Sequence, residues 1–70
     1  MKLNMIDARG LSCPEPVLVS KKALEVHPVG IQVMVDNTTA RENVTRFGRN
    51  AGYSIELKEV QGDYLLTIKK

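Results

Sequence analysis

The stretch GLSCPEP at residues 10–16 separates a strand-like segment from a helical one, and it holds the chain's only cysteine. Proline is tolerated in the first turn of a helix, where the N–H groups have no intrahelical partner. Proline also disfavours helical backbone at the residue before it. The stretch therefore predicts that a helix begins at Pro14 and that Cys13 lies just outside it, near the N-cap.

A cysteine in this position is expected to ionise readily. The unpaired N–H groups and the dipole of a helix favour an anion at its N-terminus, and they lower the pKa of a thiol below its reference value of about 8.5. Because Pro14 and Pro16 have no N–H, the amides of Glu15 and Val17 are the expected donors to a thiolate. We predict that Cys13 is the reactive residue; the alternative is a small buried side chain, which a free cysteine often is.

On both sides of this stretch the sequence follows strand and helix patterns. Strands are predicted over residues 2–9, 31–36, 54–60 and 64–69, and the last two form a hairpin around the short connection 61–63. Helices are predicted from Pro14 to about His27, and from a cluster of capping residues at 36–39 to about Ala51. In the second helix, Thr39 and Glu42 have the spacing of a capping box.

Each predicted helix carries one apolar stripe. The stripes comprise Pro16, Val17, Val19, Ala23, Leu24 and Val26 in the first helix, and Ala40, Val44, Phe47, Gly48 and Ala51 in the second. Gly48 within its stripe suggests a close approach to the sheet or to the first helix. We predict an α+β fold over a single domain, residues 1–70: a two-layer α/β sandwich in β-α-β-α-β-β order, whose four-stranded mixed sheet has two helices packed on one face.

The composition of the chain disfavours several classes of function. The net charge is only +2 and 4% of the residues are aromatic, which disfavours nucleic-acid binding. One cysteine and one histidine are too few for a closed zinc site, and neither a metal nor a cofactor is expected. The sequence shows no secretory signal and no membrane-spanning run, and a lone cysteine fits a reducing compartment, so a cytoplasmic protein without a membrane partner is expected.

The segment Asp7–Pro16, with a Gly-Leu pair directly before Cys-Pro-Glu-Pro, resembles the signature of the TusA/SirA-like sulfur carrier family. The resemblance covers essentially the whole chain, and residues 36–47 are most similar to the YedF-type branch, which is linked to selenium metabolism. It implies that Cys13 accepts sulfane sulfur as a persulfide from a donor such as a cysteine desulfurase and passes it to an acceptor protein. Such a protein is a sulfurtransferase-like carrier rather than a stand-alone turnover enzyme.

Other residues have supporting roles in this interpretation. The residues that support the motif are Asp7, Gly10, Leu11, Pro14, Glu15 and Pro16. The two prolines stiffen the first turn of the helix, and Asp7 is expected to fix the backbone of residues 10–12 by hydrogen bonds. Glu15 either caps the helix N-terminus in solvent or contacts a basic patch on a partner.

Two surface features are candidates for partner binding. Leu18 falls on the polar side of the first helix, one turn beyond Cys13, and is either an ordinary exposed leucine or a partner contact. Arg41, Arg46 and Arg49 form a basic stripe on the second helix. This stripe is either a solvated helix face, or a surface that docks an acidic partner or steers an anionic sulfur species.

Two other functions stay open beside the carrier. A redox-sensing or regulatory binding module would use the same exposed thiol at the Cys-Pro-Glu-Pro helix tip. An RNA-binding protein would use the arginine stripe, although the scarcity of aromatic residues makes this the weakest of the three interpretations. A Cys13→Ser variant separates them, because a carrier loses all sulfur transfer whereas a binding module keeps its affinity.

Overall fold

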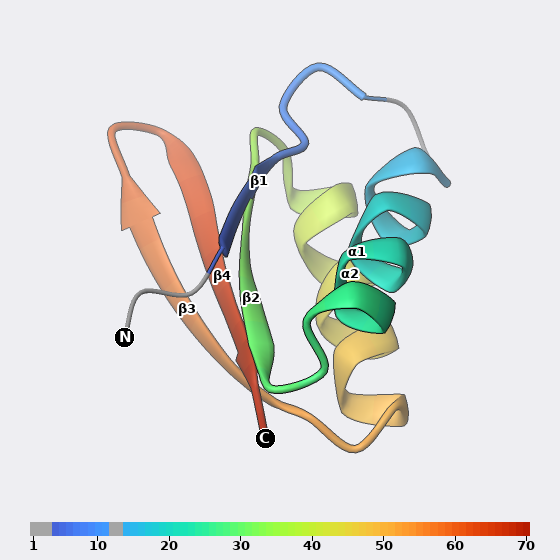
Figure 1. The fold of residues 1–70 in the computed structure, drawn as a ribbon. Helices are drawn as coiled ribbons and strands as arrows, with labels where there is room; N and C mark the ends of the chain where they lie inside the picture. Colours follow the sequence, from blue (N-terminus) through green and yellow to red (C-terminus); the bar gives the residue numbers. More distant parts are fainter. Residues whose placement is uncertain (1–3, 12–13) are drawn as a thin grey trace.

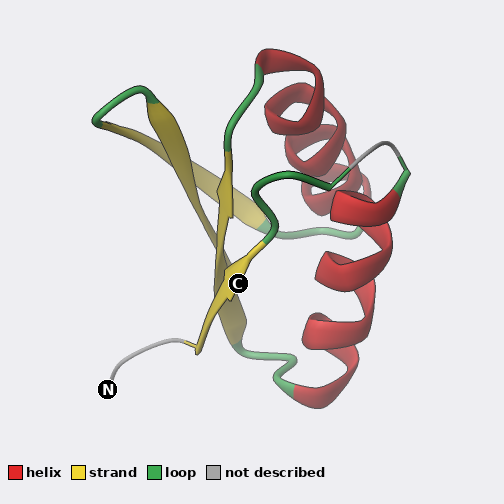
Figure 2. Cartoon of the chain, turned by 90° about the horizontal axis from the view of Figure 1, so that it is seen from above, coloured by secondary structure: helices red, strands yellow, loops and turns green. Residues whose placement is uncertain are grey.

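The sheet has four strands, and both helices pack against the same face of it (Figures 1 and 2). The structure is a computed structural model that describes residues 4–11 and 14–70. Its elements are β1 (Asn4–Asp7), α1 (Glu15–Val26), β2 (Gly30–Val35), α2 (Thr38–Asn50), β3 (Ser54–Val60) and β4 (Asp63–Lys69). The predicted α+β sandwich and its element order are confirmed. Neither helix has the length and apolarity that crossing a membrane requires, within the described residues.

The strand order decides where the motif lies. The order across the sheet is β1-β2-β4-β3; β1 is parallel to β2, and β4 is antiparallel to both of its neighbours. The carboxyl ends of the parallel strands β1 and β2 therefore share one edge of the sheet. Because a helix follows each of these strands, both helices begin at that edge, and so does the loop that joins β1 to α1 (Figure 1).

The hydrophobic core lies between the helices and one face of the sheet. Alternation along β2 buries Ile31, Val33 and Val35 completely, and its neighbour β4 does the same with Leu66 and Ile68. The buried apolar set is completed by Ala8, Leu24, Ala40 and Val44. Each fully buried large aliphatic side chain contributes roughly 1.5–3 kcal/mol relative to an exposed one, so the two central strands carry most of the packing.

The structure corrects several expectations about the helices. The N-cap of α2 is Asn37, whose Oδ1 accepts a hydrogen bond from the Ala40 N–H at 2.7 Å, so the expected capping box at Thr39 and Glu42 is wrong. Val26 is 71% exposed, because it ends α1 at the rim of the sandwich. Ala51 is also exposed, because it follows the last residue of α2 as its C-cap.

Ser20 is buried although it is a polar residue. It lies among the polar residues of α1 in sequence, yet its side chain is fully buried. Its hydroxyl donates a hydrogen bond to the Pro16 carbonyl at 2.7 Å, one turn earlier in the same helix. Because the hydroxyl has this local partner, a small polar residue fits in the core without an unsatisfied group.

Two glycines have a clear role: Gly62 in a turn with positive φ, and Gly48 in a close approach to the sheet. The hairpin between β3 and β4 turns at Gln61 and Gly62, both with positive φ, which is the pattern of the tight turns that match strand twist. At Gly48, an added Cβ would lie 2.5 Å from Cδ1 of Ile55, and Ile68 is the next side chain. The predicted close approach is therefore made to the sheet and not to α1.

Candidate functional site

The motif loop begins at the carboxyl end of β1. The Ala8 N–H donates to the Met34 carbonyl at 2.8 Å, so the backbone leaves the sheet directly after this residue. Gly10 has a φ of +78°, and Leu11 is half-buried against the core. Ser12 and Cys13 lie outside the described residues, so the predicted reactive residue is located only by its neighbours in the sequence.

Helix α1 begins one residue later than predicted, with Pro14 as the N-cap. The Pro14 carbonyl accepts hydrogen bonds from the Val17 and Leu18 N–H groups, both at 3.1 Å. The Val17 amide is thus engaged within the first turn, which corrects the expectation that it serves a thiolate. Pro16 is fully buried, whereas Glu15 is exposed in the first turn, where a carboxylate suits the helix dipole.

An arginine holds two carboxylates at the start of the loop. The Arg9 side chain donates from Nε and Nη2 to the two oxygens of Asp7, each at 2.9 Å, and from Nη1 to Asp63 at 3.1 Å. The Arg9 backbone N–H also donates to Asp7 at 3.1 Å. The side-chain hydrogen bond from Arg9 is the largest cause that lowers the pKa of Asp7 to about 2 from 3.8, and the same contact raises the pKa of Arg9.

In the described part of the motif loop, the Gly10 backbone is held by Asp36 and not by Asp7 as expected. The Gly10 N–H donates to Asp36 Oδ2 at 2.9 Å, while Asp7 is occupied by Arg9. Asn37 donates in turn from Nδ2 to Asp36 Oδ1 at 3.0 Å, so the cap of α2 and the motif loop share one hydrogen-bonded chain.

The sequence places Asp36 at the end of a predicted strand and both Asp36 and Asn37 in a capping cluster, and it links neither residue to the motif. The parallel pairing of β1 and β2 was the signal that could have linked residues 36 and 37 to the motif. The carboxyl ends of two parallel neighbours meet at one edge, so Asp36 follows β2 beside the residues that follow β1. Arg9 was likewise missed as a clamp, because its second partner, Asp63, is 54 residues away in the sequence.

A pocket of about 250 Å³ lies between the motif and the first half of α2. Leu11 and Pro14, the described residues that flank Ser12 and Cys13 in the sequence, are part of its lining. The other lining residues are Pro16, Val17, Asn37, Thr39, Ala40 and Asn43. The wall is thus apolar on the α1 side and carries amides and a hydroxyl on the α2 side, which suits a small group brought to the motif.

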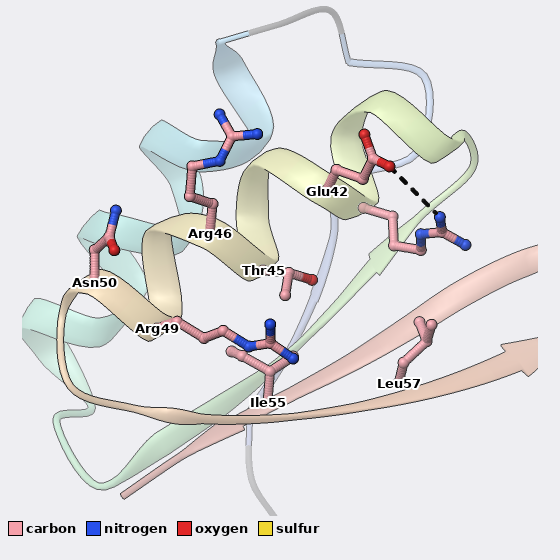
Figure 3. Close-up of a pocket in the computed structure, with 8 residues that line it drawn as sticks. Glu42, Thr45, Arg46, Arg49, Asn50, Ile55 and Leu57 are labelled. Carbon is pink, nitrogen blue, oxygen red and sulfur yellow. Dashed lines mark ion pairs between the residues drawn. The ribbon is translucent and has the colours of Figure 1, made fainter.

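The predicted arginine stripe lies on another flank of α2. Arg41, Arg46 and Arg49 line a groove of about 530 Å³ between this helix and β3. Figure 3 shows the Arg49 side chain reaching toward Ile55, whereas the Arg46 side chain points away from β3. They are joined there by Glu42, Thr45, Asn50, Ile55 and Leu57. Leu18, the other predicted partner contact, is 50% exposed on α1 and does not line either of these pockets. The structure thus brings the described residues on both sides of Ser12 and Cys13 to one end of the sheet, and it places the arginines along a separate groove.

Comparisons with known proteins find relatives that match almost the whole chain. A curated protein of Methanocaldococcus jannaschii, named as a candidate sulfur carrier, is 39% identical over 71 residues, covering 97% of this chain and 95% of its own. The sulfur carrier protein TusA of Pseudomonas paraeruginosa is 33% identical over 69 residues, covering 94% of this chain and 87% of its own. The crystal structure of a SirA-like protein from Desulfitobacterium hafniense superposes with a TM-score of 0.85 at 37% identity, covering 96% of both chains.

The sequence model of the sulfurtransferase TusA family matches residues 4–70, which include the whole motif and every described strand and helix. The chain therefore belongs to the sulfurtransferase TusA family.

Proposed function

We propose that this protein is a sulfur carrier that holds sulfane sulfur as a persulfide on Cys13 and passes it to a partner protein. The observation that carries the proposal is the position of the chain's one thiol, directly before the N-cap of α1, in a chain of the TusA family. Relatives across most of its length are named sulfur carriers. We place the carrier in the cytoplasm, where reducing conditions keep a lone thiol free.

The proposed transfer needs no outside oxidant. The Cys13 thiolate attacks the terminal sulfur of a donor persulfide, R–S–SH; a new S–S bond forms to Cys13 while the donor's S–S bond breaks, and the donor leaves as the thiolate R–S⁻. The terminal sulfur keeps its proton and its oxidation state throughout the exchange. Delivery repeats the step in the forward direction, with an acceptor thiolate attacking the terminal sulfur carried by Cys13.

The surroundings of the motif support this chemistry. The α1 N-terminus favours an anion, and the buried Pro16 anchors the first turn against the core. The pocket beside Leu11 and Pro14 offers space next to the motif for a small group of a partner.

Intact-mass measurement after incubation with a cysteine desulfurase and cysteine tests the proposal. We expect one added sulfur atom on the wild-type protein, removed by a reducing agent, and none on a Cys13→Ser variant. Alkylation of Cys13 before incubation is a matched control, because it blocks the thiol without changing the sequence.

The result also separates the carrier from the alternative function. A protein that stays unloaded by the desulfurase and by a low-molecular-weight persulfide, although its thiol reacts with iodoacetamide, contradicts the carrier proposal. That result favours the redox-sensing or regulatory module, whose thiol reacts with oxidants but does not deliver sulfur.

The similarity to the YedF-type branch extends the proposal to selenium. Selenium is chemically close to sulfur, so the same thiolate attack would load a perselenide from a selenium donor. Incubating the desulfurase with an equal mixture of cysteine and selenocysteine and weighing the loaded protein compares the two elements directly. Preferential selenium loading supports a link to selenium metabolism, and loading by sulfur alone removes it while leaving the carrier proposal intact.

A further inference from the structure

The groove between α2 and β3 is a second site on the molecule, separate from the pocket beside the motif. Its helical wall is formed by Arg41, Glu42, Thr45, Arg46, Arg49 and Asn50, which recur at intervals of one turn along one flank of α2. Its strand wall is formed by Ile55 and Leu57, alternate residues of β3 on the helix-facing side of the sheet (Figure 3).

The groove carries uncompensated positive charge. Arg41 is already engaged, because its guanidinium lies 5.0 Å from the Tyr64 ring centroid and 3.9 Å from a Glu42 carboxylate oxygen. Among the residues that the structure describes, neither Arg46 nor Arg49 forms an ion pair. The one anion in the lining, Glu42, lies against Arg41, so Arg46 and Arg49 remain as unpaired cations and fit an acidic ligand.

The strand wall of the groove is apolar. This wall belongs to β3, which is an edge strand of the sheet. Leu57 is 52% exposed, although its cross-strand partner Leu66 is fully buried. Within the described part of the chain, β3 pairs with β4 on one side only, so its other side presents backbone N–H and C=O groups. An extended peptide can add to such an edge through its own backbone.

We infer that this groove docks an acidic, extended segment of a partner protein alongside β3. An aliphatic side chain of the segment lies on Leu57, and two carboxylates on the same face pair with Arg46 and Arg49. The α2 wall from residue 41 to residue 49 is about 12 Å long at 1.5 Å per residue, which matches about four extended residues at about 3.3 Å each. A segment with one aliphatic and two acidic residues at alternate positions therefore spans the groove.

A protein segment fits these features better than RNA. None of the eight lining residues is aromatic, so the groove offers no surface for stacking bases. Its exposed leucine instead favours an aliphatic contact. The inference deepens the proposed function, since the groove would be a docking surface for a sulfur donor or acceptor. Only the role of the partner, as donor or acceptor, rests on the proposed function.

A titration of ¹⁵N-labelled protein with a synthetic peptide tests the inference by NMR. The peptide has seven residues, in which one leucine and two glutamates alternate with threonines. The protein carries Cys13→Ser, so that the result is independent of sulfur loading. We expect amide shifts concentrated on residues 54–58 and on the 45–50 half of α2. A peptide with glutamines in place of the glutamates is expected to bind about tenfold more weakly, since two exposed ion pairs are lost.

Matched variants assign the binding to the groove. An Arg46→Gln, Arg49→Gln double variant is expected to lose about tenfold in affinity, and Leu57→Thr to weaken binding while preserving a strand-forming residue. A Lys21→Gln, Lys22→Gln variant removes the same charge from the exposed face of α1 and is expected to bind like the parent.

Three results would overturn the inference. These are the absence of shifts on β3, equal weakening by the α1 control variant, and tighter binding of a single-stranded RNA of equal charge that shifts the same amides. None of them bears on sulfur loading, which the intact-mass experiment measures on protein that retains Cys13. Failure of docking and failure of the carrier proposal are therefore distinguishable.

Discussion

Individual side chains hold the motif loop through contacts that reach from β2 and β4. Asp36 accepts the Gly10 N–H and is itself held by Asn37, while Arg9 joins Asp7 to Asp63. All of these groups except the half-buried Asp63 are exposed, and exposed ion pairs contribute little to stability. Their value lies in limiting the conformations of the backbone that leads into residues 12 and 13.

Removing the Asp36 carboxylate should loosen the loop without unfolding the protein. A lost hydrogen bond corresponds to about 0.5–1.5 kcal/mol, so hydrogen exchange at the Gly10 amide should accelerate by about 2- to 10-fold in Asp36→Ala. Native-state exchange measured by NMR checks this. The matched variant Asp7→Ala should leave Gly10 exchange nearly unchanged; acceleration in this variant and not in Asp36→Ala would restore the original expectation for Asp7.

Acid should release the Arg9 clamp between about pH 4 and pH 2. The pKa of Asp7 is lowered to about 2 in the folded protein from 3.8, so its contribution is complete above the unfolded value and is lost as the pH falls through the folded one. Carboxyl ¹³C titration should give a midpoint near 2 for Asp7. In Arg9→Lys, which lacks the bidentate fork, the midpoint should rise toward 3.8, and an unchanged midpoint would exclude Arg9 as the cause.

At the scale of elements, the periodicity of the sequence predicts the interiors of the helices and strands better than their first and last residues. The strand at 54–60 and the turn after it were located correctly, since alternation and a short connection with glycine are local signals. The ends of the helices depend on which of several capping residues meets the right backbone. In α2, Asn37 has an extended backbone and caps the helix, whereas Thr39 falls inside it.

The cap of α2 can be tested by comparing neighbouring residues. Asn37→Ala should lower the free energy of unfolding by about 1 kcal/mol, because it removes the acceptor of the Ala40 N–H. Thr39→Ala should change it by less than about 0.5 kcal/mol, since Thr39 is exposed within the first turn. Urea denaturation measures both values, and a larger loss in Thr39→Ala would support the capping box that the spacing suggested.

For the whole molecule, the order of the strands in the sheet decides which apolar residues are buried in the core. Leu57 and Leu66 face each other on adjacent strands, yet one is 52% exposed and the other is fully buried. The difference arises because β4 lies in the middle of the sheet beneath the helices, whereas β3 lies at its edge. The side chain of Leu57 is therefore exposed at the groove, where a ligand can contact it.

This difference predicts unequal costs for the same truncation. Leu66→Ala should lower the free energy of unfolding by about 2–5 kcal/mol, which is a large share of what a 70-residue core supplies. Leu57→Ala should cost less than about 1 kcal/mol, because solvent fills the space that the side chain leaves. Thermal unfolding followed by circular dichroism checks both variants, and similar losses would mean that Leu57 is part of the core.

The sequence by itself determined the order of the elements, the face that each buries and the motif that identifies the family. These follow from local periodicity, from proline and glycine positions, and from one contiguous segment, residues 7–16. Only the tertiary structure decided that Asp36 holds the Gly10 amide, that Arg9 reaches Asp63 and that Leu57 lines one groove with the arginines of α2. Such contacts depend on strand order and on which edge each strand end reaches, and hydrophobic periodicity carries no information about either.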